Sequence, residues 1–384
     1  MITSNSPARR PLWPALIAAA SVSLAGCSSF GEDPSGSHLE QIASSPNYNR
    51  EKEQFQNRRP ELVAAMRERM SFWGMTWQFM TSDAVSKPAE ALPEVHPDIS
   101  AFMSPGQDVR FIWLGHSTIL VNVAGKILLL DPVFSDNAAP VPFMVSRFQK
   151  PAISLTSLPP IDYVIITHDH YDHLDQQSIE FFKDQQTRFI TPLGVSSHIK
   201  SWGIDAGRLH ELDWWQSLQL DDLELICTPA QHFSGRTGMN GNKTLWASWV
   251  VRRVGHSLYF SGDSGYDTHF QEIGRRYGPF DVAFVENGQY NERWKEVHMM
   301  PAETIQAVQD LRSRKFVPIH WGMFVLALHD WYDPVEQSAA YAQKAGVEML
   351  TPLLGQIVYT QRAGYLERWW RRYMPSALQP VSPD

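Results

Sequence analysis

The sequence predicts an α/β fold in which β-sheets are sandwiched between layers of helices. Short apolar strands come first, from about residue 108, and strands mixed with helices follow, an order typical of packed sheet and helix layers. The 384 residues, 43% of them hydrophobic, are enough to bury a sizeable core. The composition is not that of a disordered, collagen-like or coiled-coil protein. We therefore expect one large domain with appendages, or at most two domains.

The predicted strands are short runs of apolar, β-branched and aromatic residues. Residues 118–123 and 126–130 predict a hairpin that turns at Ala124-Gly125. The other predicted strands are 109–114, 163–167, 188–190, 223–227, 246–251, 257–260, 282–285 and 315–319.

Helices are predicted between several of these strands. One begins at Pro301, a residue favoured in the first helical turn, and its apolar residues recur at helical spacing. Another runs from about Pro334 to Lys344 and ends before Gly346. A weaker pattern spans residues 61–80, where Trp73 and Trp77 lie one turn apart.

The amino terminus predicts a signal peptide over residues 1–26. A basic pair, Arg9 and Arg10, precedes a mostly apolar run over residues 12–24. This run is too short to cross a bilayer comfortably, which favours a cleaved signal over a transmembrane helix. It ends in Leu24-Ala25-Gly26-Cys27, which resembles the bacterial lipoprotein box.

That resemblance implies cleavage before Cys27 and lipidation of its sulfur. The residue after the cysteine is Ser28 rather than the aspartate that tends to retain lipoproteins in the inner membrane. We expect a lipid-anchored protein of the cell envelope, in the outer membrane and facing the periplasm. Residues 27–50 are rich in Ser, Gly, Pro and Asn and are expected to form a tether.

Charge and cysteine content narrow the possible partners. The formal net charge is -8 and there is no long Lys/Arg run, so we expect no nucleic-acid partner. If Cys27 is acylated, Cys227 is the remaining cysteine and no internal disulfide can form. Cys227 lies in an apolar strand, which predicts a buried, inert thiol.

The main domain is expected over residues 105–361, flanked by two appendages. Residues 51–104 are interpreted as an extension that packs on this domain. Residues 362–384 form an aromatic and basic tail, with Tyr-Leu-Glu-Arg-Trp-Trp-Arg-Arg-Tyr over residues 365–373. Such a tail suits a membrane interface, or alternatively docks its tryptophans on the core.

The strongest chemical signal follows the predicted strand 163–167. There the chain reads His168-Asp169-His170-Tyr171-Asp172-His173, with four candidate metal ligands in six residues. Imidazole and carboxylate groups are suitable zinc ligands, and alternate spacing lets a loop turn several of them inward. One loop cannot complete two metal sites, but His232, Asp263 and His320 each stand just after other predicted strands. Strand ends along one rim converge, so we expect these residues to join the first four.

At this level of detail the sequence resembles the metallo-β-lactamase superfamily, whose fold is an αββα sandwich of two mixed sheets flanked by helices. It is similar in particular to the N-acyl-phosphatidylethanolamine-hydrolysing phospholipase D family. The resemblance covers roughly residues 105 to 360. It rests on the following segments: Gly115-His116-Ser117-Thr118, Asp131-Pro132-Val133-Phe134-Ser135, Leu158-Pro159-Pro160-Ile161-Asp162, the His168 motif, Glu211-Leu212-Asp213-Trp214-Trp215, Thr228-Pro229-Ala230-Gln231-His232, Gly262-Asp263-Ser264-Gly265-Tyr266, Gly278-Pro279-Phe280-Asp281 and Ile319-His320-Trp321-Gly322.

The family pattern implies two zinc ions. It assigns His168, His170 and His232 to one ion, and Asp172, His173 and His320 to the other, with Asp263 bridging the two. Catalytic roles are thereby implied for Asp172 and Asp263, and a hydroxide that bridges the metals is expected to attack the substrate.

Three further residues are candidates for supporting roles. Asp131 is expected either to orient a ligand imidazole or to close an Asp-Pro turn. His116 is interpreted as a core histidine or as an outer partner of the ligands. His298 matches a histidine of the family's His-x-x-Pro segment, and is expected to protonate a leaving group, to contact the substrate or to pack beside a helix start. The segment Glu286-Asn287-Gly288-Gln289-Tyr290 departs from the more apolar family sequence and is expected to line the pocket.

The resemblance implies a phospholipase D-type phosphodiesterase acting on N-acyl-phosphatidylethanolamine-like phospholipids. A lactonase or other ester hydrolase would use the same site, and an iron oxidoreductase the same fold. A non-enzymatic envelope lipoprotein would lack ligands, whereas all seven expected positions are filled. The expected partners are thus a lipid-like substrate and a membrane, reached through the anchor and the tail.

Overall fold

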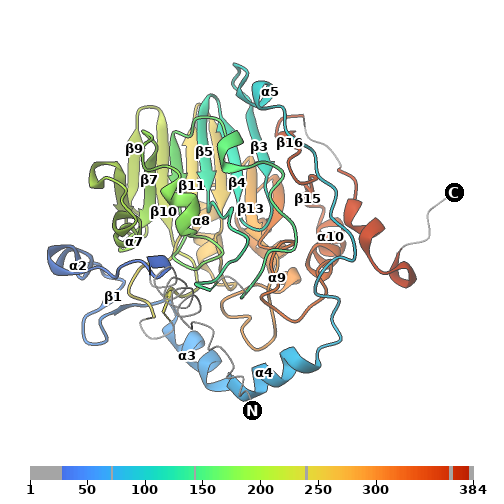
Figure 1. Cartoon of the computed structure of the whole chain (residues 1–384), viewed down its shortest axis with the longest axis horizontal. Helices are drawn as coiled ribbons and strands as arrows, with labels where there is room; N and C mark the ends of the chain where they lie inside the picture. Colours follow the sequence, from blue (N-terminus) through green and yellow to red (C-terminus); the bar gives the residue numbers. More distant parts are fainter. Residues whose placement is uncertain (1–27, 71, 142–143, 238–240, 363–365, 380–384) are drawn as a thin grey trace, which may run out of the picture.

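The computed structural model describes residues 28–70, 72–141, 144–237, 241–362 and 366–379. The expected signal peptide and Cys27 lie outside these residues. Two seven-stranded mixed sheets face each other, and helices flank them (Figure 1). The predicted αββα sandwich is therefore confirmed. None of the described helices is long and apolar enough to cross a membrane.

The first sheet has the strand order β16-β3-β4-β5-β6-β7-β8. The predicted hairpin is confirmed, because Val123 pairs with Lys126 across the Ala124-Gly125 turn. Strands β5 to β8 are parallel, and the remaining pairings are antiparallel. The bounds are β3 (Val109–Trp113), β4 (Ile119–Val123), β5 (Lys126–Leu130), β6 (Tyr163–Ile165), β7 (Arg188–Pro192), β8 (Leu209–Leu212) and β16 (Ile357–Tyr359).

The second sheet has the order β15-β14-β13-β12-β11-β10-β9. Its strands β12 to β15 are parallel, and β9 to β12 are antiparallel. The bounds are β9 (Ser217–Leu220), β10 (Leu223–Thr228), β11 (Ser248–Arg253), β12 (His256–Phe260), β13 (Val282–Glu286), β14 (Lys315–Ile319) and β15 (Glu348–Met349).

Both predicted helices of the second half are present. The first begins at Pro301 as predicted, and the second ends at Gly346, whose φ of 68° is readily adopted by glycine. The helices of the main domain are α5 (Ile99–Met103), α6 (Gln176–Glu180), α7 (Ser196–Ser201), α8 (His269–Tyr277), α9 (Pro301–Asp310) and α10 (Asp333–Ala345). Short 3-10 helices cover Leu155–Ser157, Ala206–Arg208, Trp369–Tyr373 and Ser376–Leu378.

Central strands are apolar on both faces because both faces are covered. In β3, Phe111 belongs to the core between the sheets. Its ring packs edge-on against the ring of Phe284, with centroids 5.0 Å apart. Its neighbour Ile112 points into the outer core of its sheet. On the other side of the sandwich, Val285 packs in a cluster that includes residues of α8, α9 and α10. The short continuous apolar runs in the sequence follow from this double burial.

The described part of residues 27–50 differs from the expected tether. It contains α2 (Gly36–Ile42) and β1 (Tyr48–Asn49), and Ile42 is fully buried in the main core. His38 Nε2 lies 2.7 Å from Glu211 Oε2, and Asn47 donates to Asp213. Its Ser- and Asn-rich composition therefore supplies docking contacts rather than a solvated linker, and the tether prediction is wrong for residues 28–50.

Residues 51–104 pack on the main domain. Strand β2 (Gln54–Phe55) buries Phe55 in the main core, and α3 (Pro60–Arg69) contributes buried Val63 and Met66 to a smaller cluster. The predicted helix over residues 61–80 is instead two helices. Met70 has extended backbone angles, and α4 (Phe72–Thr81) begins after it.

The tail packs its tryptophans on the core. Trp369 and Trp370 are 3% and 1% exposed, and Trp370 donates to Glu336. The ring of Trp369 also stacks on the ring of Trp321, with centroids 5.7 Å apart. The docking interpretation is confirmed for Trp369 and Trp370, whose burial leaves these two side chains no exposed surface for a membrane contact.

Candidate metal centre

The candidate ligands converge because their strands all run toward one edge of the sandwich. The loop with His168, His170, Asp172 and His173 follows β6 of the first sheet. His232 follows β10, Asp263 follows β12 and His320 follows β14 of the second sheet. The structure thus brings all seven expected ligands together at one end of the two sheets.

Three imidazoles form the first cluster. His170 Nδ1 lies 3.0 Å from His168 Nε2 and 3.2 Å from His232 Nε2. Asp263 Oδ2 lies 3.8 Å from His168 Nε2 and 3.7 Å from His232 Nε2. Three nitrogens and one carboxylate oxygen that point at one another form a donor set suited to a tetrahedral zinc site.

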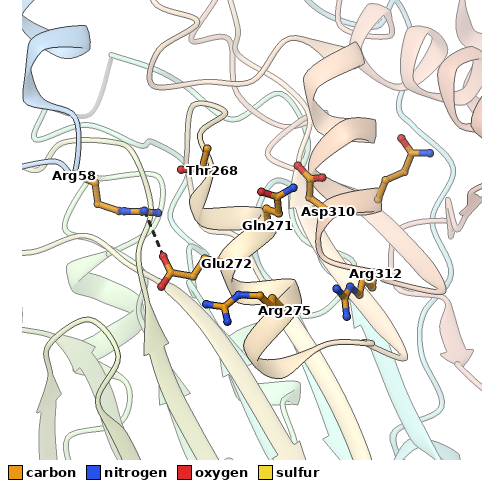
Figure 2. A pocket seen from close by; sticks show the side chains of 8 residues that line it. Arg58, Thr268, Gln271, Glu272, Arg275, Asp310 and Arg312 are labelled. Atoms are coloured by element: carbon orange, nitrogen blue, oxygen red, sulfur yellow. Dashed lines mark ion pairs between the residues drawn. The ribbon is translucent and has the colours of Figure 1, made fainter.

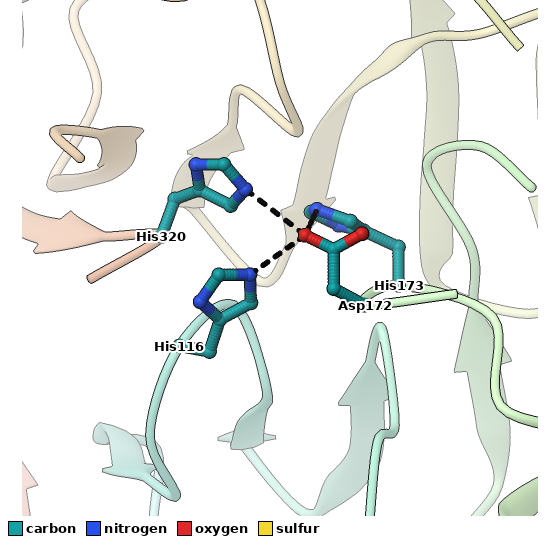
Figure 3. A group of neighbouring side chains, drawn as sticks. All are labelled: His116, Asp172, His173 and His320. Atoms are coloured by element: carbon teal, nitrogen blue, oxygen red, sulfur yellow. Dashed lines mark hydrogen bonds and ion pairs between the residues drawn. The ribbon is translucent and has the colours of Figure 1, made fainter. Parts of the chain in front are cut away.

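The second cluster is centred on Asp172 (Figure 3). Asp172 Oδ2 lies 3.2 Å from His320 Nε2 and 3.5 Å from His173 Nε2. Asp263 reaches this cluster too, with Oδ2 3.1 Å from His320 Nε2 and Oδ1 3.2 Å from His173 Nε2. Asp263 is therefore the carboxylate that both clusters share.

Two buried polar atoms indicate that these clusters are built for cations. Neither His173 Nε2 nor Asp263 Oδ1 has a hydrogen-bond partner, although both are buried and face each other. Unsatisfied buried polar groups are destabilising and call for an explanation. A metal ion is such an explanation, so the residues fit the metals that the family pattern implies.

Charge balance in the site is consistent with this reading. Burial alone would raise the pKa of Asp263, but His173 and His320 outweigh it and hold that pKa well below its usual range. Burial lowers the pKa of His320, but Asp263 and Asp172 raise it to about 10. Without a metal, His320 is therefore protonated, and its positive charge balances the negative charge of the carboxylates. A bound cation would displace that proton.

Asp131 and Thr167 support the first loop. Asp131 Oδ2 lies 2.7 Å from His173 Nδ1, the nitrogen that faces away from the cluster. The same carboxylate accepts hydrogen bonds from the Thr167 amide and hydroxyl, at 2.8 and 2.7 Å. This geometry matches the orienting role expected of Asp131.

Gly262 allows the approach of Asp263 to the first loop. Its φ is 56°, and a Cβ there would lie 2.7 Å from the Thr167 side chain and 3.0 Å from the Ala247 carbonyl. Only glycine fits such a contact without displacement of its neighbours.

Three residues in or beside the two metal clusters, none of them glycine, have positive φ. These are His116 at 51°, Asp131 at 39° and His320 at 66°. Such conformations cost about 1–3 kcal/mol each and concentrate at functional sites. The His320 amide donates to the His116 carbonyl at 3.1 Å, which joins two of the strained turns.

His116 lies beside the second cluster rather than in a separate part of the core. Its Nε2 is 2.9 Å from Asp172 Oδ2, and the residue is 1% exposed. Burial lowers the pKa of His116 to about 3, so the ring is neutral and its Nε2–H can donate to Asp172. The interpretation of His116 as an outer partner of the ligands matches this position.

His298 faces the same site from the loop before α9. Its ring stacks on His320 with centroids 5.1 Å apart and an interplanar angle of 5°. Its Nδ1 lies 3.0 Å from Oε2 of Glu286, the last residue of β13. Glu286 is fully buried, and its Oε1 also accepts the Met299 amide at 2.6 Å. Glu286 therefore holds His298 by one nitrogen and leaves Nε2 for the cavity.

Two supporting residues, Asn57 and Asp169, were given no role in the sequence analysis. Asn57 of the extension bonds both backbone groups of His232. Asp169 accepts from Thr244 Oγ1 at 2.8 Å and from the Gly235 amide at 2.7 Å, which ties down the first loop. The available signal for Asp169 was its place within the His168 motif, whereas Asn57 offered none.

A cavity of about 230 Å³ opens onto the clusters. One side is formed by site residues, including His170, Asp263 and His298. The remaining walls are mostly apolar, and Met66 of α3 belongs to them. These walls consist of Met66, Met70, Phe233, Gln289, Trp294, Val297 and Leu326.

A second hollow of about 540 Å³ lies beside α8 and α9 (Figure 2). It is lined by charged and polar residues, and Arg58 pairs there with Glu272 at 3.3 Å. No residue of the metal clusters lines it, so it is separate from the site.

The fold and the paired clusters, taken together with the similar proteins described next, identify a metal-dependent hydrolase. Residues 126–321 match the family model described as the Beta-lactamase superfamily domain. The chain therefore belongs to the metallo-β-lactamase superfamily, as its motifs predicted.

Similar proteins place it in one branch of that superfamily. It is 41% identical to an uncharacterized protein of Mycobacterium tuberculosis over 302 residues, which covers 77% of this chain and 80% of that protein. It is 35% identical to the N-acyl-phosphatidylethanolamine-hydrolyzing phospholipase D 1 of Caenorhabditis elegans over 234 residues, 57% of this chain and 65% of that protein. The branch resembling these phospholipases, expected from the motifs, is thereby confirmed.

Two further similarities concern location and fold. Over 102 residues, 27% of this chain, it is 52% identical to the outer membrane protein RomA of Klebsiella pneumoniae, of which 76% is covered. The structure of an isothiocyanate hydrolase from Delia radicum gut bacteria is similar with a TM-score of 0.53 at 18% identity, covering 65% of this chain and 98% of that one. This structural similarity supports the fold alone.

Proposed function

We propose that this chain is a dinuclear-zinc phosphodiesterase of the phospholipase D type, acting on N-acyl-phosphatidylethanolamine-like phospholipids. One observation carries the proposal: two adjoining ligand clusters lie at the end of a cavity whose other walls are mostly apolar. A phospholipid needs this combination, because its charged phosphate and its acyl chains require opposite surroundings. The similarity to relatives named as phospholipases of this type supports the choice.

The residues divide into two metal sites. His168, His170 and His232 would hold one zinc ion, and Asp172, His173 and His320 the other. Asp263 would contact both ions. When bound, the two cations would activate water and offset negative charge on the phosphate oxygens.

The apolar walls would bind the lipid portion of the substrate and exclude bulk water. Met66 and Trp294 are only 3% and 7% exposed, so bulk solvent does not surround these parts of the cavity wall. Exclusion of water strengthens each electrostatic interaction between the phosphate and the site.

His298 is the proposed proton donor. A water oxygen bonds to phosphorus, and the water gives up one proton to solvent. The bond from phosphorus to the alcohol oxygen breaks, and the leaving alkoxide takes a proton from His298 Nε2, which regains one from solvent. The products are phosphatidate and an N-acylethanolamine. Glu286 keeps Nδ1 engaged, so the proton-donating nitrogen is the one in the cavity.

The proposed location is the cell envelope, with Cys27 lipidated and the domain facing the periplasm from the outer membrane. The lipoprotein box supports it, and so does the similarity to a protein named as an outer membrane protein.

Turnover of N-acyl-phosphatidylethanolamine by the purified zinc-loaded chain tests the activity. In oxygen-18 water, we expect the heavy oxygen in phosphatidate and none in the N-acylethanolamine. Release of free fatty acid, or hydrolysis of acyl-lactones without any phosphatidate, would instead identify an ester hydrolase or lactonase on the same site.

A further inference from the structure

We infer that the metal-site end of the sandwich docks on a phospholipid bilayer at two points, the exposed face of α4 and the amino-terminal segment at Ser28. The inference deepens the proposed function, on which it rests, because it assigns the surface from which a lipid would enter the cavity. Neither point belongs to the metal clusters.

Helix α4 has the surface chemistry of a membrane contact. Its sequence, Phe72 to Thr81, contains no charged residue. Trp77 and Met80 are 68% and 77% exposed, more than any other large hydrophobic side chain in the described part of the chain. They are three residues apart and therefore share a face of the helix. Tryptophan is favoured at membrane interfaces, where its ring is apolar and its N–H remains hydrated.

This helix adjoins the cavity. Met70 lines the cavity, and α4 begins two residues later at Phe72. Met66, one turn earlier in α3, forms part of the same wall. An acyl chain that leaves a bilayer at α4 would meet this apolar wall before it reached the metal clusters.

The amino-terminal point is fastened to the metal loop. Trp202 Nε1 donates to the Ser28 carbonyl at 2.8 Å. Arg236 donates to the Ser29 carbonyl from Nε and Nη2, at 3.0 and 2.7 Å, and from Nη1 to the carbonyls of Asp169 and Leu174 at 2.5 and 2.9 Å. Asp169 stands between two candidate metal ligands. The side chain of Arg236 therefore links Ser29 directly to the loop that carries those ligands.

The chain that precedes Ser28 identifies the occupant. Ser28 directly follows Cys27, the residue that the lipoprotein box marks for acylation. An acyl group there would enter the bilayer beside the metal loop, without an intervening tether. Figure 1 shows the amino-terminal segments, including α3 and α4, gathered at the lower end of the sandwich. A bilayer, rather than a protein partner, would satisfy both points at once.

Vesicle sedimentation of the chain from Ser28 onward tests the α4 contact without the signal peptide or the acyl group. Vesicles of phosphatidylethanolamine and phosphatidylglycerol should bind it, and Trp77→Ser with Met80→Ser should weaken binding at least about tenfold, since two large apolar contacts are lost. Val254→Ser is the matched control, because Val254 is 52% exposed in the β11–β12 turn at the opposite end of the strands. Equal binding by the double variant, or a change in its oligomeric state instead of its vesicle binding, would overturn the inference.

Two activity measurements separate this inference from the proposed function. Hydrolysis of soluble bis(4-nitrophenyl) phosphate should be unchanged in the double variant, whereas turnover of vesicle-embedded substrate should fall at least about tenfold. If the parent chain cleaves no phospholipid, the phospholipase proposal fails while the vesicle-binding result still decides the docking surface. If the double variant and the parent chain cleave embedded substrate equally, the proposed docking surface is wrong and the phospholipase proposal stands.

The acylated chain tests the second point. A long glycine-serine insertion between Cys27 and Ser28 should leave the protein in the membrane fraction but lower turnover of embedded substrate several-fold, because the effective concentration of the site at the bilayer falls. The same insertion at the carboxyl terminus should have no effect. Unchanged turnover with the amino-terminal insertion would exclude the fixed anchor at Ser28.

Discussion

The side chain of Asn57 pairs with both backbone groups of His232. Asn57 Nδ2 donates to the His232 carbonyl at 2.7 Å, and Asn57 Oδ1 accepts the His232 amide at 3.0 Å. The imidazole of His232 is held separately, with Nδ1 3.0 Å from the Val297 carbonyl. The amino-terminal extension thus positions a candidate metal ligand that lies 175 residues further along the chain.

Replacement of Asn57 by alanine should therefore weaken metal binding. The change leaves a buried amide and carbonyl unpaired, which costs about 1–3 kcal/mol of unfolding free energy. We expect zinc affinity to fall about 10–100-fold, as for other residues that orient ligands. Competition with a chelator measures the affinity. Asn137→Ala, which removes an exposed bond to the Met144 carbonyl, should change neither quantity.

The ligand assignment makes a prediction about metal content. His168→Ala should remove the metal of the first cluster, and Asp263→Ala should lower the content of both because Asp263 contacts both. Elemental analysis of protein purified without added metal gives the number and identity of the bound ions. His96→Ala, at an exposed histidine, is the control. Full metal content in both ligand variants would contradict the assignment of these residues as ligands.

The roles proposed for His298 and Glu286 predict a dependence on the leaving group. His298→Gln should lower kcat for N-acyl-phosphatidylethanolamine by about 100-fold or more, the usual size of a general-acid effect. A 4-nitrophenyl phosphodiester should be affected little, because its leaving group needs no proton. Glu286→Gln preserves volume and should show the same selectivity at smaller size.

Glu272→Gln serves as a control for loss of a charge elsewhere, because Glu272 pairs with Arg58 away from the site. Equal losses on both substrates in the Glu286 variant would indicate a purely structural role for Glu286.

Docking of residues 28–50 should depend on pH through His38. The hydrogen bond to Glu211 raises the pKa of His38, against the lowering effect of burial. A raised folded-state pKa means that this stabilisation is complete below the unfolded pKa, about 6.5, and is lost as pH rises through the folded value. We expect proteolysis within residues 28–50 to accelerate on moving from mildly acidic to alkaline pH. His38→Ala should remove that difference while the rest of the domain stays resistant.

The strands and the seven candidate ligands could be predicted from the sequence because their signals lie in short, continuous segments. Each ligand stands just after a short apolar strand, and strands of a sandwich that run the same way end at one edge. Strand β14 and His320 illustrate this: the apolar run and the histidine after it are contiguous. The amphipathic helix that begins at Pro301 was readable for the same reason, since spacing alone defines its buried face.

The break between α3 and α4 was not readable in this way. Met70 is a good helix former, and neither proline nor glycine marks the boundary. The docking of residues 28–50 was missed as well, because a composition of Ser, Gly, Pro and Asn describes a docked segment and a solvated tether equally. Contacts such as His38 with Glu211 join residues 173 positions apart, and no local pattern encodes them.

The sequence by itself determined the class of chemistry, because ligand types and their places at strand ends are local properties. Only the tertiary structure decided what surrounds those ligands: that Asn57 holds His232, that Glu286 holds His298, and that Met66 and Met70 wall the cavity. It also decided that the tail tryptophans are buried while Trp77 is exposed. The physical reason is that a side-chain pattern specifies which face of an element is buried, whereas its partner is set by the packing of segments far apart in the chain.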